Sequence, residues 1–262
     1  MNRRIRAMVS RYVVLHFRSP ARVMDLFFWP LMELLVWGFF TVYLQKQLGG
    51  KPSLVSSLLF AMVFWDILYR AQQSVSLAFM EELWTRNILN LLISPLRTWE
   101  WVVAAYIYGL IKTVIVAAFL MTAAVVLYAL DPGSLGLLFV PFFVNLLLMG
   151  WALGLFTAGL LLRLGHAAEA IIWGVPFLIQ PFSAVFYPLS VYPAWLKPFC
   201  LSLPSTLVME GMRRATLENA MPWAHLAGAF AMNLVYLALA SAFYGYMLEQ
   251  GRATGRVIRL TT

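Results

Sequence analysis

The chain is 262 residues long, 62% hydrophobic and only 11% charged, with a mean hydropathy of +0.80. Soluble domains carry about a quarter charged residues, so this composition excludes an ordinary soluble protein and indicates a polytopic membrane protein. The formal net charge is +8, but the basic residues flank hydrophobic runs, where they set topology, so we expect no nucleic-acid partner. The single cysteine, Cys200, excludes a fold framed by internal disulfides.

The first 24 residues contain six arginines and no acidic residue. Apolar residues such as Ile5, Met8 and Val9 are interleaved with these arginines, which predicts an amphipathic helix at the membrane interface over residues 1–24. No short apolar core with a small-residue cleavage site follows, so we expect no cleavable signal.

Six long hydrophobic runs come next, each near or above the roughly 20 residues that a helix needs to cross a bilayer. They cover residues 26–44, 54–80, 102–127, 135–162, 170–189 and 223–248. The predicted fold class is therefore an all-α polytopic membrane protein with six transmembrane helices, and residues 1–262 form one membrane domain.

The distribution of basic residues predicts the orientation. With the N-terminus inside, the inner segments hold most of the lysines and arginines, because positive residues concentrate on the cytoplasmic side. The outer loops then carry only Lys46, Lys51, Lys197, Arg213 and Arg214. This predicts that both termini are cytoplasmic and that residues 81–95 lie in the cytoplasm.

The segment 81–95 is short, charged and amphipathic. Glu82 and Arg86 are four residues apart, so on a helix they share a face and can pair. Ser94-Pro95 ends that helix, because proline disfavours helical geometry in the residue before it. Two interpretations remain open at this point: a connecting helix that only buries apolar surface, or a coupling helix that contacts a soluble motor subunit.

Four ionisable side chains fall within the predicted spans: Glu33, Asp66, Arg70 and Lys112. Such groups are costly in hydrocarbon and face a protein interior or a wet cavity. The i, i+4 spacing predicts an Asp66–Arg70 pair, and Glu33 is the remaining acid that can partner Lys112. These charges either fix helix packing or line a substrate or proton pathway.

A stripe of small residues, Gly150, Gly154 and Ala158, permits close approach of another helix. This motif is common in membrane helices. It serves packing within one subunit or dimerisation, and the sequence does not separate the two.

The connection over residues 190–221 is rich in both proline and apolar residues. An apolar external segment is expected to re-enter the edge of the membrane, so we predict a re-entrant stretch of short helices. Trp195 belongs to its apolar part, while Glu210 and Arg213 form a charged patch. It is either a simple lid or a site of substrate exit.

Several catalytic signatures are absent from the sequence. Gly49-Gly50-Lys51 lacks the upstream glycine of a Walker A loop, so this chain does not bind ATP by that motif. There is no H-E-x-x-H, cysteine pair or G-x-S-x-G, which argues against an enzyme or a metal site. We expect no catalytic residue, no metal and no cofactor in this chain.

The chain resembles the membrane subunit of a bacterial type-2 ATP-binding-cassette (ABC) exporter in four places. The basic N-terminal helix is the first, and residues 181–199 (PFSAVFYPLSVYPAWLKPF) are similar to the family's Phe/Tyr-Pro and Pro-x-Trp-Leu signature. Leu203-Pro204 with Glu210 and Arg213 resembles its L-P…E-x-x-R ending. The segment between spans two and three resembles its E-x-x-x-R…L-L-x-x-P-L pattern through Glu82, Arg86, Leu91, Leu92, Ser94, Pro95 and Leu96.

The resemblance implies a permease in the bacterial inner membrane, in which two copies pair with two separate ATPase subunits that bind ATP and Mg²⁺. It favours the coupling role for the segment 81–95. The residues implied in contacts with the ATPase are Glu81, Glu82, Arg86, Leu91, Leu92 and Pro95.

Substrates of such exporters include glycans, glycolipids, lipids and hydrophobic drugs. The 19 Phe, 11 Tyr and 10 Trp residues can stack on sugar rings, but aromatic residues also form ordinary membrane belts. Competing hypotheses are an ATP-independent ion-coupled carrier or channel that uses the four intramembrane charges, and a scaffold without transport activity.

Overall fold

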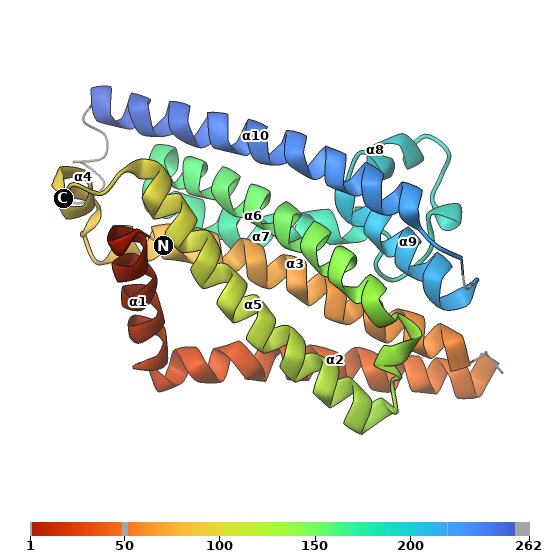
Figure 1. Cartoon of the computed structure of the whole chain (residues 1–262). Coiled ribbons are helices and arrows are strands. Elements are labelled where there is room, and N and C mark those ends of the chain that lie inside the picture. The colour runs from red at the N-terminus through yellow and green to blue at the C-terminus, as the bar shows by residue number, and fades with distance from the viewer. Residues whose placement is uncertain (1, 49–51, 219, 255–262) are drawn as a thin grey trace.

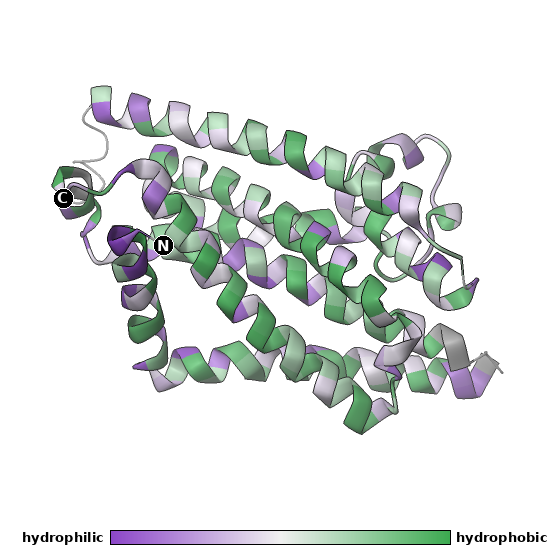
Figure 2. Ribbon diagram, viewed as in Figure 1, coloured by the Kyte–Doolittle hydropathy of each residue, from purple (hydrophilic) through white to green (hydrophobic). Residues whose placement is uncertain are grey.

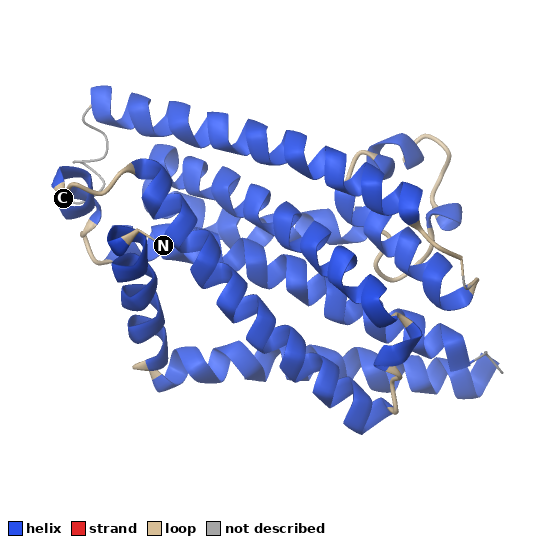
Figure 3. Cartoon of the chain, in the orientation of Figure 1, coloured by secondary structure: helices blue, strands red, loops and turns tan. Residues whose placement is uncertain are grey.

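In the computed structural model, the described residues are 2–48, 52–218 and 220–254, and every regular element within these ranges is a helix (Figure 3). The predicted all-α class is confirmed. The long helices are α2 (Pro20–Leu48), α3 (Pro52–Trp84), α5 (Thr98–Tyr128), α6 (Phe139–Leu164) and α10 (Trp223–Ala253). The shorter ones are α1 (Arg3–Phe17), α4 (Ile88–Ile93), α7 (Glu169–Ile179), α8 (Lys197–Leu201) and α9 (Pro204–Leu217).

Four of the described helices, α2, α5, α6 and α10, are both long and apolar enough to cross a membrane. Helix α3 is the longest at 33 residues, but it carries Asp66 and Arg70 in its middle. Its side chains are almost all buried among the other helices. Helix α3 is thus the central element of the bundle.

The fifth predicted span is wrong as a single helix over residues 170–189. Helix α7 has 11 residues and passes into a 3₁₀ turn, η4 (Gln180–Phe182). Ala184 then adopts a left-handed conformation (φ 53°), which ends helical geometry, and Pro188 keeps the chain extended. The stretch Glu169–Phe182 rises only about 21 Å at 1.5 Å per residue, less than the ~30 Å hydrocarbon core.

The interfacial helix is also shorter than predicted. Helix α1 ends at Phe17, and Pro20 opens α2, so residues 20–24 belong to the first long helix. Proline suits this position because the first turn of a helix has no intrahelical partner for its N–H groups. The buried side of α1 includes His16, and its apolar members (Ile5, Met8, Val9 and Tyr12) belong to the same cluster as residues of α3 and α5.

Close packing of α6 on α3 accounts for the stripe of small residues. A Cβ added at Gly150 would lie 2.7 Å from the carbonyl oxygen of Leu68, and one at Gly154 would lie 2.8 Å from that of Gln72. Both distances are shorter than atoms tolerate. The stripe therefore serves packing within one copy of the chain.

Polar side chains join the same helices. Ser76 Oγ and Thr157 Oγ1 are 2.6 Å apart between α3 and α6, and Gln72 Nε2 donates to the Ile172 carbonyl of α7 at 3.2 Å. Such bonds replace water inside the bundle and fix the register of the three helices.

The molecule has two distinct ends (Figure 1). At one end, which we call the α1–α4 end, α1 runs across the bundle beside α4, and the last turn of α10 lies nearby. Helices α8 and α9 lie at the opposite end. Figure 2 shows that hydrophilic residues concentrate on α1, while the long helices are mostly apolar.

Candidate functional site

The prediction of one amphipathic coupling helix over residues 81–95 is wrong. Helix α3 continues to Trp84, the chain turns at residues 85–87, and α4 covers only Ile88–Ile93. Arg86 has φ 53° in this turn and is exposed. The predicted Glu82–Arg86 pair is wrong, because the left-handed residue ends the helix on which the two would share a face.

The two glutamates that open this segment pair with α1 and with the start of α2 instead. Glu82 is fully buried; Arg11 forms an ion pair with it, and Asn87 Nδ2 donates to it at 2.7 Å. Glu81 accepts from Arg22 Nη1 at 2.6 Å. These carboxylates hold the basic N-terminal region against the end of α3.

A second set of contacts joins α1 to the chain around Pro95. Arg4 Nη1 donates to the Pro95 carbonyl at 2.6 Å, and it lies 3.5 Å from a carboxylate oxygen of Glu100. Asn2 Nδ2 also donates to Glu100, whose other role is to cap the first turn of α5 at Arg97. The sequence analysis did not predict this network. The only signal for it was an N-terminal region rich in arginine and free of acids, which needs acidic partners elsewhere in the chain, here Glu81, Glu82 and Glu100.

Residues facing away from the bundle are the ones free to meet a partner. On the described part of this segment, Arg86 and Asn90 are exposed, and Ile93 is 83% exposed at the tip of α4. Leu91 is half-buried, and the side chain of Leu92 lies outside the described part of the structure. The segment thus divides into an inner, positioning part (Glu81, Glu82) and an outer, accessible part.

His16, near the C-terminal end of α1, contacts Tyr108 of α5. Its Nδ1 lies 3.1 Å from the hydroxyl of Tyr108, while its Nε2 is buried without a hydrogen-bond partner within the described residues. Burial lowers the pKa of His16 to about 4, and the neighbouring charges of Lys112 and Arg22 act in the same direction. The imidazole is therefore neutral at physiological pH.

The predicted Asp66–Arg70 pair is present, with 3.3 Å between Arg70 Nε and Asp66 Oδ1 and both side chains buried. The predicted Glu33–Lys112 pair is wrong. Lys112 Nζ lies over the ring of Tyr108, 5.5 Å from its centroid, and lines a cavity of about 180 Å³ with His16 and Arg22. Glu33 lines a different and larger hollow.

That larger hollow is a groove of about 570 Å³ between α2, α3 and α7. Its wall is aromatic, and Glu33 and Arg70 reach it from opposite helices. It is the place where two of the four intramembrane charges meet accessible space. Because a membrane charge is retained where it faces a cavity, we take this groove as the candidate ligand site and call it the α2–α3–α7 groove.

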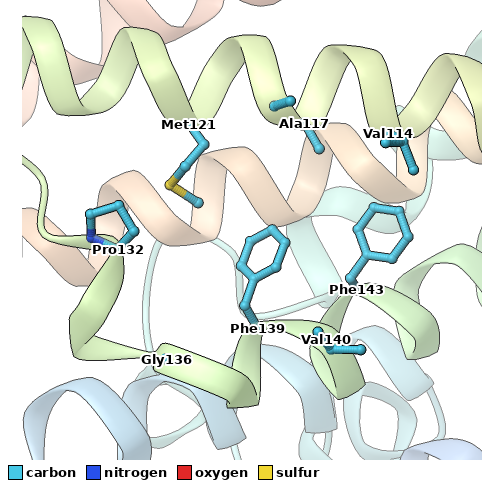
Figure 4. A pocket seen from close by; sticks show the side chains of 9 residues that line it. Val114, Ala117, Met121, Pro132, Gly136, Phe139, Val140 and Phe143 are labelled. Carbon is cyan, nitrogen blue, oxygen red and sulfur yellow. The ribbon is translucent and has the colours of Figure 1, made fainter.

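A second hollow lies between α5 and the start of α6 (Figure 4). Its volume is about 470 Å³, and side chains such as Met121, Phe139 and Phe143 point into it. No charged side chain lines it, and Val114 and Val140 are exposed at its edge (47% and 57%). It suits an apolar chain such as a lipid tail and has no group that would select a substrate.

At the opposite end, α9 is tied to the chain that follows α7. Arg213 donates to Glu210 Oε1 at 3.0 Å through Nη1 and to the Val185 carbonyl at 2.8 Å through Nη2. Glu210 also accepts the backbone N–H of Leu189 at 2.9 Å. Trp195 is 78% exposed and takes no part in this contact. The patch predicted from sequence is thus a clamp that holds the broken chain after α7.

Comparison with known families decides the identity. The model of the ABC-2 type transporter family matches residues 3–217, which is most of the chain. The chain belongs to this family. It is a membrane subunit of an ABC transporter, a transport component that does not itself carry the catalytic ATPase, and its family implies an ABC ATPase partner. A comparison of this permease with curated proteins finds no match.

Proposed function

We propose that this ABC-2 permease is the membrane half of an ATP-driven exporter in a bacterial inner membrane, working as a homodimer with two separate ATPase subunits. The six predicted spans correspond to α2, α3, α5, α6, the short α7 with its clamp, and α10. The cargo is a glycan, glycolipid, lipid or hydrophobic drug. The observation that carries the proposal is the family match together with α4, on which Asn90 and Ile93 are exposed and whose N-cap residue Asn87 is hydrogen-bonded to the buried Glu82.

The α1–α4 end supports a role in coupling. An ATPase that pushes on α4 moves the adjoining turn, and that turn is joined to Glu82 through Asn87. Glu82 in turn is joined to α1 through Arg11. A push at the exposed surface is therefore passed to α1, α3 and α5 together rather than absorbed by a loose loop. A cytoplasmic ATPase can reach α4 only if the α1–α4 end faces the cytoplasm. We therefore place this end and both termini on the cytoplasmic side, as the basic residues of α1 favour.

The α2–α3–α7 groove supports the dimer. It lies on the surface of one copy, where Trp29 and Val36 are 61% and 66% exposed. One copy does not enclose a path there. A second copy facing it would.

The test is site-specific photocrosslinking in native membranes. A benzophenone amino acid at Asn90, exposed on α4, is expected to crosslink to an ATPase with a Walker motif. The matched control is Leu137, which is 90% exposed just before α6, at the far end of the bundle. Crosslinking from Leu137 alone, or from neither site, would contradict the proposed coupling surface.

The alternative is an ATP-independent carrier that uses Glu33, Asp66, Arg70 and Lys112. It predicts substrate flux in liposomes that contain this chain alone. The Asp66–Arg70 pair is already neutralised internally, which favours the exporter. Flux without any ATPase would reverse that preference.

A further inference from the structure

A four-residue repeat on α2 sets the character of the α2–α3–α7 groove. Asp25, Trp29, Glu33 and Trp37 occur at every fourth position, so they share one face of the helix, and all four line the groove. Acid and tryptophan alternate along this face. The facing helices α3 and α7 contribute four more aromatic side chains, Trp65, Tyr69, Trp173 and Phe177.

The uncompensated charge in the groove is negative. Arg70 lines the groove, but Asp66 neutralises it at 3.3 Å. Asp25 and Glu33 have no ion pair or hydrogen bond from any described side chain. Glu33 is half-buried, whereas Asp25 is exposed and also lines the neighbouring cavity of about 180 Å³ with Arg22 and Lys112. A carboxylate in an apolar wall, such as that of Glu33, is costly without a counter-charge, so the groove is complementary to a positive ligand.

Aromatic rings add to this preference. The face of a tryptophan ring attracts organic cations, more strongly when water is excluded. Ammonium or phosphonium groups with apolar substituents are weakly hydrated and match a wall made of rings and carboxylates. The volume of about 570 Å³ lies within the roughly 300–1,000 Å³ of small-molecule sites.

We propose that the α2–α3–α7 groove binds amphipathic organic cations, with the positive centre at Asp25 and Glu33 and the apolar body against the tryptophans. That such a cation is the exported cargo rests on the proposed function, but the binding itself does not. A glycan would find few neutral hydrogen-bonding side chains in this lining, and an anion would meet two carboxylates.

Two ions of nearly the same size and shape test the proposal. Tetraphenylphosphonium and tetraphenylborate differ in the sign of their charge, so a site selected by apolar contact alone binds both. Binding of each to the full chain in lipid nanodiscs is measured by equilibrium dialysis, with empty nanodiscs subtracted. We expect saturable binding of the cation, at least about tenfold tighter than that of the anion.

Variants locate the site. Glu33→Gln keeps the shape of the side chain and removes its charge, so we expect about tenfold weaker cation binding, with most of it restored in Glu33→Asp. Asp25→Asn is an independent second variant, useful if Glu33→Gln does not fold. The matched control is Glu249→Gln, because Glu249 is an exposed acid of α10 outside the groove.

Three results would overturn the proposal. The first is equal or tighter binding of tetraphenylborate. The second is cation binding that neither Glu33→Gln nor Asp25→Asn weakens. The third is a groove without cation binding: saturable binding of a neutral oligosaccharide such as maltohexaose would mean that it takes a sugar, and no binding of any ligand would mean that a second copy fills it. The assay contains no ATPase, so intact cation binding beside a failed ATPase crosslink would reject the proposed function and leave this site standing.

Discussion

At the scale of single residues, Glu81 and Glu82 show how differently two adjacent carboxylates are held. The side chain of Glu82 is 0% exposed and that of its partner Arg11 is 32% exposed, whereas Glu81 and its partner Arg22 are 16% and 42% exposed. Removing one member of a buried pair leaves the other without compensation, but an exposed pair contributes little.

Because Arg11 is 32% exposed and stays partly hydrated without its partner, we expect Glu82→Gln to destabilise the purified chain by about 1–3 kcal/mol, and Glu81→Gln by about 0–1 kcal/mol. Thermal unfolding in the same detergent measures both. Equal losses for the two variants would show that the ion pair of Glu82 is not the buried contact described above.

His16 predicts a dependence of stability on pH. Its pKa in the folded chain is about 4, below its ordinary value of 6.5, so between these values the unfolded chain binds more protons. The stability that neutral His16 contributes is complete above about pH 6.5 and is lost as the pH falls toward 4. Unfolding temperatures measured from pH 7.5 to 4.5 should fall in the native chain and fall less steeply in His16→Phe; parallel curves would argue against burial of the imidazole.

At the scale of helices and their junctions, the contact of α6 with α3 depends on the absence of side chains. Gly154→Ala places a methyl group against Val75 and the Gln72 carbonyl, and overpacking of this kind costs about 1–3 kcal/mol. Gly245→Ala is the matched control, since nothing lies within 4 Å of its added Cβ on α10. We expect that control to be neutral or slightly stabilising, because alanine has the higher helix propensity. A loss at Gly245 as large as that at Gly154 would refute the packing argument.

The clamp after α7 is tested by two adjacent arginines. Arg213 makes two hydrogen bonds and is buried, whereas Arg214 next to it is exposed. Arg213→Ala should cost about 2–4 kcal/mol, because it removes the ion-pair partner of Glu210 and leaves the Val185 carbonyl without its side-chain donor. Arg214→Ala should change stability by less than about 0.5 kcal/mol. Limited proteolysis between α7 and α9, faster in Arg213→Ala only, would locate the loss; identical digestion of both variants would contradict the clamp.

At the scale of the whole molecule, composition was sufficient to predict an all-helical membrane protein, because 20-residue apolar runs have few other stable conformations in lipid. Helix ends were less predictable. The fifth hydrophobic run, residues 170–189, contains prolines that disfavour a continuous helix, but its apolar length alone still predicted a single span. The shortness of α7 also depends on the left-handed Ala184, which no local pattern marks.

Pairing of charges was predictable only where it was local. The Asp66–Arg70 pair follows from spacing on one helix, but Arg11 and Glu82 are 71 residues apart in sequence and meet because α1 folds back across the end of α3. The same limit applies to Glu33 and Lys112, whose helices place them at different hollows. The four-residue repeat of acid and tryptophan on α2 was readable from the start, but its meaning required the facing helices.

The most direct test of the central claim is to purify this chain gently from its native membrane and identify its partners by mass spectrometry. We predict a stoichiometric ATPase that carries Walker motifs, in a complex with two copies of each subunit. A folded, dimeric chain that comes out reproducibly without any ATPase would contradict the exporter and turn attention to the intramembrane charges.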